Sequence, residues 1–351
     1  MLAHWTNFLR LCLSMAMVEG YINSPAPDRT MFDNGVLRRT PGRERTIHWP
    51  SAEPVPVQKE IQLLMSGALV RRGEFGPLHG SRALEVELEC GELGLTVHQA
   101  LSIRKQLIMR KTLKGSWKLK DESTMNTIKK KFEHQQRSLQ EISQEYDLPP
   151  VSIFRAIVAP RVLDAYPQFT GLDRHRPAGR IVQSIINEDD QENVKSFLSE
   201  WELKELQNAK DHDLVGYNDS NCTAAEEWEQ TIYKFLDERD IKYITEDTMK
   251  LHGDEAKGTP DCLLLDDLFI NGQKIRWIEF KSFYASGLKE NSYFTKKSVC
   301  KQVERYQREF GKNGAVIMKN GFSGKISQRY PSTLFLDGGP LYAVSEYYYN
   351  L

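Results

Sequence analysis

The chain has 351 residues, of which 40% are hydrophobic and 27% charged, so it is long enough for two domains with buried cores. Its formal net charge of −1 excludes any argument for nucleic-acid binding from overall charge, and such a role must rest on local basic clusters. Five scattered cysteines form no CxxC pair. We therefore expect reduced thiols in an intracellular protein and no structural zinc.

Residues 1–94 are predicted to form a poorly defined extension. The apolar stretch from Leu9 to Val18 is too short to cross a bilayer, so we expect no membrane association. A targeting segment, a disordered extension and an artefact of the gene structure all remain open for this region.

Residues 95–180 are predicted to be a helical domain. Thr96 can cap a helix that runs to about Lys114, and Ser138 with Glu141 has the spacing of a capping box. A short helix after Ser138, a turn and a second helix from Val151 to Val162 resemble a helix-turn-helix, a unit that Pro160 and Pro167 would end. In that case Ser152 and Arg155 would contact DNA, whereas an ordinary helical hairpin is the alternative. Basic residues between 104 and 131 form a local positive cluster that favours phosphate binding, or simply a solvated face.

Linker helices are expected over 181–222, followed by a second domain over 223–351. Its first helix is predicted from Thr223 to Asp240, with a capping box formed by Thr223 and Glu226. Glu229 lies beside the apolar stripe of this helix, where a carboxylate can reach a metal site at the end of a sheet. A solvated glutamate is the alternative.

A hairpin follows, with Asn271-Gly272 between two apolar strands. A strict two-residue loop would place Asp261 on the opposite face of the hairpin from Glu279 and Lys281. A three-residue loop with a bulge at Gly272, or another irregularity of the same parity, would place all three side chains on one face. We predict such an irregularity. An ordinary hairpin with a solvated Glu and Lys is the alternative.

Asp261, Glu279 and Lys281 are the residue types that a Mg²⁺-dependent phosphodiesterase needs, namely hard oxygen ligands and one amine. Their order is that of a PD-(D/E)xK nuclease core. Downstream, an amphipathic helix is expected from Lys297 to Phe310, with Gln302 and Tyr306 one turn apart. An apolar strand from Ala315 to Met318 completes an α+β order.

Three segments carry a resemblance to a known family: Gly-Thr-Pro-Asp-Cys-Leu-Leu, Ile-Arg-Trp-Ile-Glu-Phe-Lys-Ser, and Tyr-Gln-Arg-Glu-Phe-Gly with the later Gly-Ala-Val-Ile. They resemble the codanin-interacting nuclease family, whose members have a Thr-Pro-Asp signature, belong to the PD-(D/E)xK nucleases and are similar to archaeal Holliday-junction resolvases. The resemblance is clearest from Thr223 to about Phe322. It implies a restriction-endonuclease-like α/β/α core with a mixed sheet.

The resemblance also implies roles for individual residues. Asp261, Glu279, Glu229 and the backbone carbonyl of Phe280 would bind Mg²⁺ or Mn²⁺, and Lys281 would be the catalytic lysine. Gln302, Tyr306 and Ser282 would contact substrate or support the site. The implied partners are DNA and a codanin-like protein, and the implied location is the nucleus and cytoplasm. Cleavage of junction DNA would favour a homodimer.

Three interpretations follow from the sequence. The first is an active metal-dependent nuclease that cleaves structured or junction DNA, and it is preferred because Asp261, Glu279 and Lys281 are all present. The second is a catalytically silent nuclease fold that binds nucleic acid or serves as a scaffold for a codanin-like partner. The third is an unrelated α/β enzyme, which predicts that the carboxylates of Asp261 and Glu279 lie far apart.

Overall fold

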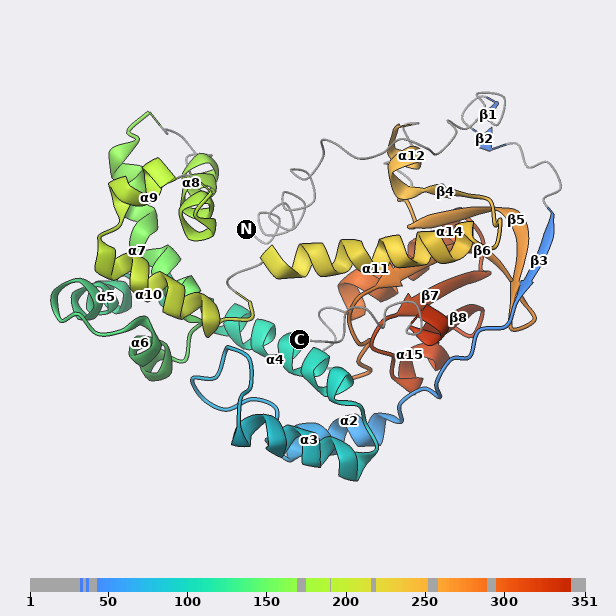
Figure 1. Ribbon diagram of the computed structural model, residues 1–351, viewed down its shortest axis with the longest axis horizontal. Helices are drawn as coiled ribbons and strands as arrows, with labels where there is room; N and C mark the ends of the chain where they lie inside the picture. Colours follow the sequence, from blue (N-terminus) through green and yellow to red (C-terminus); the bar gives the residue numbers. More distant parts are fainter. Residues whose placement is uncertain are drawn as a thin grey trace. The chain divides into compact units, whose positions relative to one another are not determined.

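The computed structural model describes residues 43–168, 175–189, 191–215, 219–251, 258–288 and 295–341, together with the short strands β1 (Phe32–Asp33) and β2 (Val36–Leu37). Most of the predicted extension before residue 43, including the apolar stretch from Leu9 to Val18, lies outside the described residues. None of the described helices is long and apolar enough to span a membrane. The described chain forms two compact units, one mostly helical and one built on a sheet (Figure 1).

The helical unit comprises residues 56–219 with the segment 288–293. Its helices are α2 (Val57–Met65), α3 (Ser81–Leu93), α4 (Val97–Gly115), α5 (Glu122–Lys129), α6 (Leu139–Tyr146), α7 (Pro150–Ala165), α8 (His175–Asn187), α9 (Gln191–Phe197) and α10 (Glu200–Asp211), with shorter turns η2 (Ser116–Leu119) and η3 (Lys130–His134). The predicted cap at Thr96 and the predicted capping box of Ser138 with Glu141 are confirmed at the starts of α4 and α6. The region from residue 43 to 94, predicted to be an extension, instead contains a strand and two helices.

Helix α7 occupies the centre of the helical unit, where it packs against α5, α6, α8, α9 and α10. The second helix, predicted from Val151 to Val162, is confirmed as α7, which contains Pro160 and continues to Ala165. No residue of α7 before Asp164 is exposed, and Arg155 donates to Gln183 Oε1 at 2.8 Å. A helix that reads DNA needs a free face for the major groove. The ordinary helical hairpin is therefore the better description of α6 and α7.

The sheet unit contains residues 1–55, 220–287 and 294–351. Its described elements are β3 (Glu44–Ile47), α11 (Asp219–Asp237), β4 (Tyr243–Thr245), α12 (Glu246–Leu251), β5 (Cys262–Ile270), β6 (Gln273–Lys281), η5 (Thr295–Cys300), α14 (Lys301–Glu309), β7 (Gly314–Met318), α15 (Gly324–Arg329), β8 (Thr333–Asp337) and η6 (Gly339–Leu341). Helix α11 begins at Asp219, so the capping box predicted at Thr223 and Glu226 falls inside the helix and is wrong.

The six strands form one mixed sheet with the order β3-β5-β6-β7-β8, and β4 pairs with β5 beside β3. Only β4 with β5 and β5 with β6 are antiparallel pairs, whereas β3–β5, β6–β7 and β7–β8 are parallel. Helices and a mixed sheet confirm the α+β class. Helix α11 packs on one face through Trp228, Ile232, Phe235 and Leu236, and α14 packs on the other through Val303 and Tyr306 (Figure 1). The sheet therefore lies between two helical layers.

The hairpin between β5 and β6 contains the irregularity that the sequence required, although not at the turn. Ile270 pairs with Gln273 across a two-residue turn, in which Asn271 and Gly272 have φ values of 50° and 81°. The predicted bulge at Gly272 is therefore wrong. Farther along, four residues of β5, 264–267, face the single residue Arg276 of β6. This shift places Asp261 in register with Glu279, which confirms the alternative of an irregularity elsewhere that restores the same parity.

Candidate active site

Asp261, Glu279 and Lys281 meet where β5 begins and β6 ends. Cys262 pairs with Ile278, so Asp261, one residue before Cys262, lies level with Glu279 on the next strand. Phe280 lies on the opposite face, in the core against α11, as predicted from the alternation of a strand. The sheet therefore directs two carboxylates and one amine to the same end and the same face. The third interpretation, which separates the two carboxylates, does not fit this arrangement.

Backbone and side-chain contacts fix the three groups. Asp261 Oδ2 accepts a hydrogen bond from the backbone N–H of Phe280 at 2.6 Å, which ties the start of β5 to the end of β6. The ammonium of Lys281 forms an ion pair with Glu279 Oε1. Glu279 is 2% exposed, and its other oxygen, Oε2, has no hydrogen-bond donor at bonding geometry in the described part of the chain, although the Tyr306 hydroxyl, which donates to the Thr259 carbonyl, is near enough to lower the pKa of this carboxyl. A buried carboxylate oxygen without a donor is unfavourable unless a cation or water satisfies it.

The electrostatics of the site show an excess of negative charge. Burial raises the pKa of Asp261 well above its usual value, and the nearby Glu279 carboxylate raises it further. Burial also raises the pKa of Glu279, which the Lys281 ammonium opposes. Burial alone would lower the pKa of Lys281, but the carboxylates of Glu279 and Asp261 outweigh this effect and raise it. Lys281 is therefore a firmly protonated cation between two carboxyl groups.

Glu229 on α11 approaches the same end of the sheet. Tyr233, one helical turn later, donates to Glu229 Oε1 at 2.6 Å and lies 3.4 Å from the carbonyl oxygen of Asp261. Burial raises the pKa of Glu229, and the carboxylates of Glu246 and Asp247 add to this effect. Glu229 therefore belongs to the same acidic environment. The sequence analysis did not single out Tyr233. Its position four residues after Glu229, one turn along the same helix, could have indicated that the two side chains meet.

The Thr-Pro-Asp segment joins three elements around the site. Thr259 Oγ1 donates to Glu246 Oε1 on α12 at 2.9 Å, and the Thr259 carbonyl accepts from the Tyr306 hydroxyl at 2.9 Å. Thr259, two residues before Asp261, thus connects α12 to α14. Sequence reasoning assigned no role to Thr259 or Glu246, because their contacts join segments that are distant along the chain.

The remaining predicted residues surround this centre. Tyr306 is 3% exposed and packs edge-to-face on Trp277, with ring centroids 5.3 Å apart, while Gln302 Nε2 lies 3.5 Å from its hydroxyl. Ser282 directly follows β6 and is exposed. Lys319 was missed by the sequence analysis: it follows β7, and its N–H donates to the Lys281 carbonyl at 2.8 Å. Its ammonium lies 5.1 Å from the centre of the Trp228 ring.

Among the described residues, no three His, Cys, Asp or Glu side chains are placed so that together they could hold a metal ion. Two side-chain carboxylates, Asp261 and Glu279, still provide hard oxygen atoms at one point, and Glu279 Oε2 is buried without a partner. Oxygen donors of this kind suit Mg²⁺ or Mn²⁺, which commonly retain water molecules among their ligands. The donor set is therefore compatible with a hydrated divalent ion.

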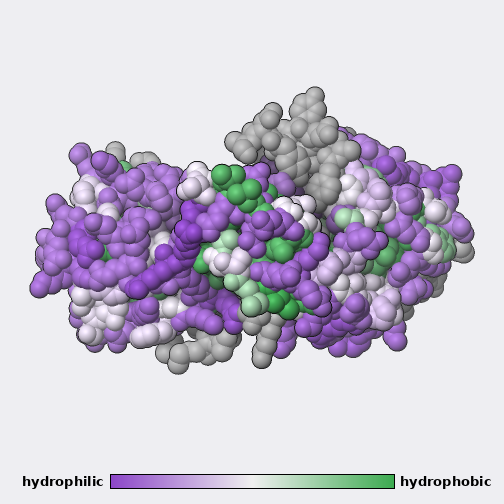
Figure 2. Space-filling model, turned by 90° about the horizontal axis from the view of Figure 1, so that it is seen from below, coloured by the Kyte–Doolittle hydropathy of each residue, from purple (hydrophilic) through white to green (hydrophobic). Residues whose placement is uncertain are grey.

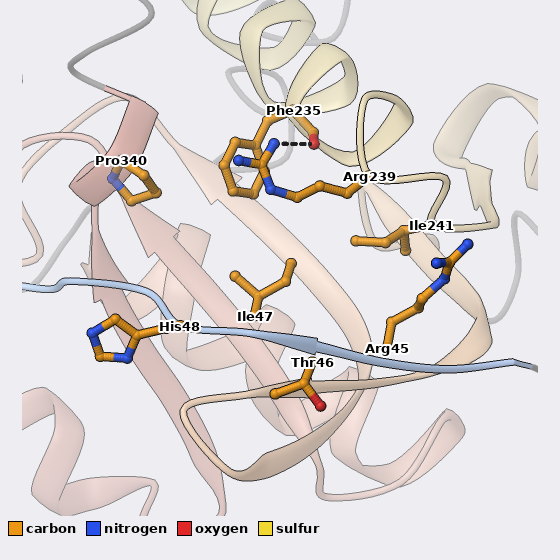
Figure 3. A pocket seen from close by; sticks show the side chains of 8 residues that line it. All are labelled: Arg45, Thr46, Ile47, His48, Phe235, Arg239, Ile241 and Pro340. Atoms are coloured by element: carbon orange, nitrogen blue, oxygen red, sulfur yellow. Dashed lines mark hydrogen bonds between the residues drawn. The ribbon is translucent and has the colours of Figure 1, made fainter.

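A pocket of about 330 Å³ lies elsewhere in the sheet unit, between β3, the C-terminal end of α11 and η6 (Figure 3). Arg239 stacks over Phe235 in this pocket, and Ile47 and Ile241 point toward it. Arg45 is held by an ion pair with Asp240 at 2.5 Å. None of the residues that line the pocket belongs to the carboxylate site, so the pocket does not define the active centre.

Comparison with known proteins places these observations in context. A family described as "Protein of unknown function TPD sequence-motif" matches residues 198–337, which include α11, β4–β8 and the whole candidate site. The chain is also 30% identical over 115 residues to the zebrafish (Danio rerio) protein CDAN1-interacting nuclease 1. Both matches support the codanin-interacting nuclease family. The alignment covers 32% of this chain and spans only 36% of the length of the zebrafish protein. No solved structure matches the chain significantly.

Proposed function

We propose that this protein is a divalent-metal-dependent nuclease that hydrolyses phosphodiester bonds, with structured or junction DNA as its substrate. The observation that carries the proposal is the meeting of Asp261, Glu279 and Lys281 on one face at one end of the mixed sheet. The similarity to a protein named as a nuclease supports the same conclusion. The order α11, antiparallel β5–β6, α14 and parallel β7 supports a restriction-endonuclease-like core.

Asp261 and Glu279 would hold the metal ion, with the Phe280 carbonyl and Glu229 as further ligands, either directly or through water. The acidic environment favours a cation here, since the pKa values of Asp261 and Glu279 are both raised by burial. When bound, Mg²⁺ or Mn²⁺ would polarise the phosphate and lower the pKa of a coordinated water.

The chain's own residues have distinct tasks in this mechanism. Lys281 is firmly protonated in the presence of Glu279, so it would stabilise the extra negative charge on the phosphate rather than remove a proton. Tyr233 orients Glu229 through its hydrogen bond. Tyr306 and Gln302 would hold the Thr259 segment in place, whereas the exposed Ser282 would contact the nucleic-acid backbone.

The β5–β6 hairpin offers a matched pair of controls for the central test. Asp267 and Lys274 lie on the same two strands and form an ion pair at 2.8 Å, but they are near the turn, away from the site. We expect Asp261→Ala and Lys281→Ala to reduce cleavage of labelled duplex, flap and four-way-junction DNA in Mg²⁺ or Mn²⁺ by at least about 100-fold, the scale of losing one charge-stabilising group. Asp267→Ala and Lys274→Ala should cleave at the wild-type rate. Equal rates for Asp261→Ala and Asp267→Ala would refute the site.

A specific observation also favours a second function, a catalytically silent nuclease fold that binds nucleic acid or acts as a scaffold. In the described part of the chain no three metal-ligating side chains are grouped, and Glu279 is already engaged by Lys281. The same assay separates the two functions, because a silent protein would bind DNA in a gel-shift experiment without cleaving it in either metal. Lys281→Ala would then change neither result.

The proposed protein partner is a codanin-like protein, since the zebrafish relative is named for an interaction with CDAN1. Residence in both nucleus and cytoplasm follows from the same proposal, as does a homodimer if four-way junctions are the substrate. Sedimentation of the purified chain with and without junction DNA would test the dimer, and imaging of a tagged chain would test its location.

A further inference from the structure

The α2–α3 pair in the helical unit carries an apolar surface that nothing in the described chain covers. Leu84 and Leu88 on α3 are 53% and 61% exposed, and Ile61 and Met65 on α2 are 41% and 82% exposed. In both helices the two residues are four positions apart, so they form a stripe along one side. Figure 2 shows hydrophobic residues gathered over this pair. Exposed apolar side chains that cluster, rather than occur singly, mark interaction sites.

This exposed surface is distinct from the face that each helix buries. Helix α3 buries Val86 and Cys90, and α2 buries Leu63, so both helices already have an inward-facing core side. The stripe of Leu84 and Leu88 continues to Gly91, where an added Cβ would meet no atom within 4 Å. A glycine at this place allows the backbone of another helix to approach closely.

The charges beside the stripe indicate the chemistry of the partner. At 100° per residue, Glu87 lies on one side of the leucine stripe of α3, while Glu89 and Glu92 lie on the other. None of these three glutamates forms an ion pair within the described residues, in contrast to Glu85, which pairs with Arg71 and Arg82. An apolar stripe between unpaired acidic groups complements an apolar stripe between basic groups.

We propose that the α2–α3 surface, defined by Ile61, Met65, Leu84, Leu88 and the three flanking glutamates, binds an amphipathic helix of a partner protein with lysine or arginine on both sides of its apolar stripe. Two packed helices that each present an i, i+4 apolar pair provide the kind of surface on which the apolar face of such a helix docks. A second copy of this chain is a poorer occupant, because a two-fold contact would bring the same glutamates face to face.

The test uses the full-length protein and a labelled 18-residue synthetic peptide that has leucines at helical i, i+3, i+4 and i+7 spacing with lysines on both sides. Its comparison peptides have the same composition in scrambled order, or glutamates in place of lysines. We expect fluorescence anisotropy to show that the ordered basic peptide binds at least tenfold more tightly than either. The pair of substitutions Leu84→Ser and Leu88→Ser should weaken binding at least tenfold.

Two further variants separate surface chemistry from folding. Trp117→Ser removes an exposed apolar side chain of the same unit outside the surface, and it should leave binding unchanged. Replacing Glu87, Glu89 and Glu92 by lysine should reverse the preference, so that the glutamate peptide binds better. Equal binding of ordered and scrambled peptides would overturn the proposal. So would a concentration-dependent dimer of the wild type that the Leu84→Ser and Leu88→Ser pair abolishes, because a second copy would then be the occupant.

Discussion

At the scale of single residues, the candidate site is an unfavourable place for negative charge. Asp261 and Glu279 are held side by side by the sheet register, and burial raises the pKa of both carboxyl groups. A carboxyl group whose pKa is raised by folding stabilises the folded state below its unfolded pKa of about 4, and this stabilisation is lost as the pH rises through the folded value. Burial of these two carboxyl groups therefore weighs against folding at neutral pH.

This reasoning predicts that Asp261→Asn stabilises the protein while removing activity. Asparagine keeps an oxygen that can accept from the Phe280 N–H but carries no charge. At pH 7 in the presence of EDTA, its melting temperature should exceed that of the wild type by a few degrees, and the difference should shrink as the pH falls toward 4. Thermal melts across this pH range measure the effect.

Metal addition provides the complementary measurement. Mg²⁺ should raise the melting temperature of the wild type, since an ion that binds only the folded state stabilises it by mass action. The Asp261→Asn protein should respond much less, and Asp267→Asn should respond as the wild type does. A wild-type protein whose melting temperature is unaffected by millimolar Mg²⁺ and Mn²⁺ would argue for the silent alternative.

At the scale of elements, the decisive feature is the irregularity in β5, where the strand changes partners. Residues 262–264 pair with β4, whereas residues 267–270 pair with β3. Between them the buried carboxylate of Asp266 accepts from the backbone N–H of Arg43 at 3.2 Å and of Lys242 at 2.8 Å. The Asp266 side chain thus holds the N-terminal ends of β3 and β4 at the point where the register of β5 shifts.

Asp266→Ala should consequently destabilise the protein by about 3 kcal/mol, because it removes two hydrogen bonds to a charged acceptor and leaves two donors without it. The neighbouring Asp267→Ala breaks an exposed ion pair with Lys274 and should cost less than about 1 kcal/mol. Urea unfolding monitored by tryptophan fluorescence gives both values. A loss of similar size in the two variants would show that Asp266 does not secure the register change.

The same irregularity shows how far the sequence could predict the site. A register irregularity of the right parity could be predicted from the sequence. The prediction used the alternating apolar residues, the Asn271-Gly272 turn and the requirement that Asp261 share a face with Glu279. Its position could not be predicted, since Asp266 secures it through Arg43 and Lys242, which lie 223 and 24 residues away in the sequence. Local turn chemistry favoured a bulge at Gly272, but contacts across the sheet placed the irregularity elsewhere.

Helix α7 illustrates the opposite limit. The apolar residues Ile153, Phe154, Ile157 and Val158 have the spacing of one helical face, from which burial can be predicted, and all four are buried. What the local pattern could not reveal is that other helices surround α7, so that none of its residues before Asp164 is exposed. Proline removes a backbone donor and was expected, at Pro160 and Pro167, to end this unit, yet α7 contains Pro160 and continues through Ala165 among its packed neighbours. Tertiary packing outweighs a local propensity of this size.

At the scale of the whole molecule, the sheet unit is assembled from parts that are far apart in the sequence. Strand β3 adds to the edge of β5, and Trp49 just after it is 2% exposed. The backbone N–H and carbonyl of Trp49 bond to the Asn271 side chain at 2.8 and 2.9 Å, and its indole N–H donates to the Asp337 carbonyl at 3.1 Å. Strand β3 could not be predicted from the sequence. It has only four residues, and its partner β5 lies more than 200 positions later.

We therefore predict that residues 220–351 alone do not form a stable domain, although they contain the whole candidate site. Without residues 43–55, the edge of β5 loses its ladder to β3, and the core loses Ile47 and Trp49. An unpaired apolar edge of this kind favours aggregation.

Joining residues 43–55 to residue 220 through a flexible glycine–serine linker should restore a cooperative thermal transition. A linked chain carrying Trp49→Ala should melt at a lower temperature by an amount that corresponds to about 3–5 kcal/mol. If residues 220–351 unfold cooperatively at the same temperature as the linked chain, β3 and Trp49 contribute nothing essential to the sheet that holds the site.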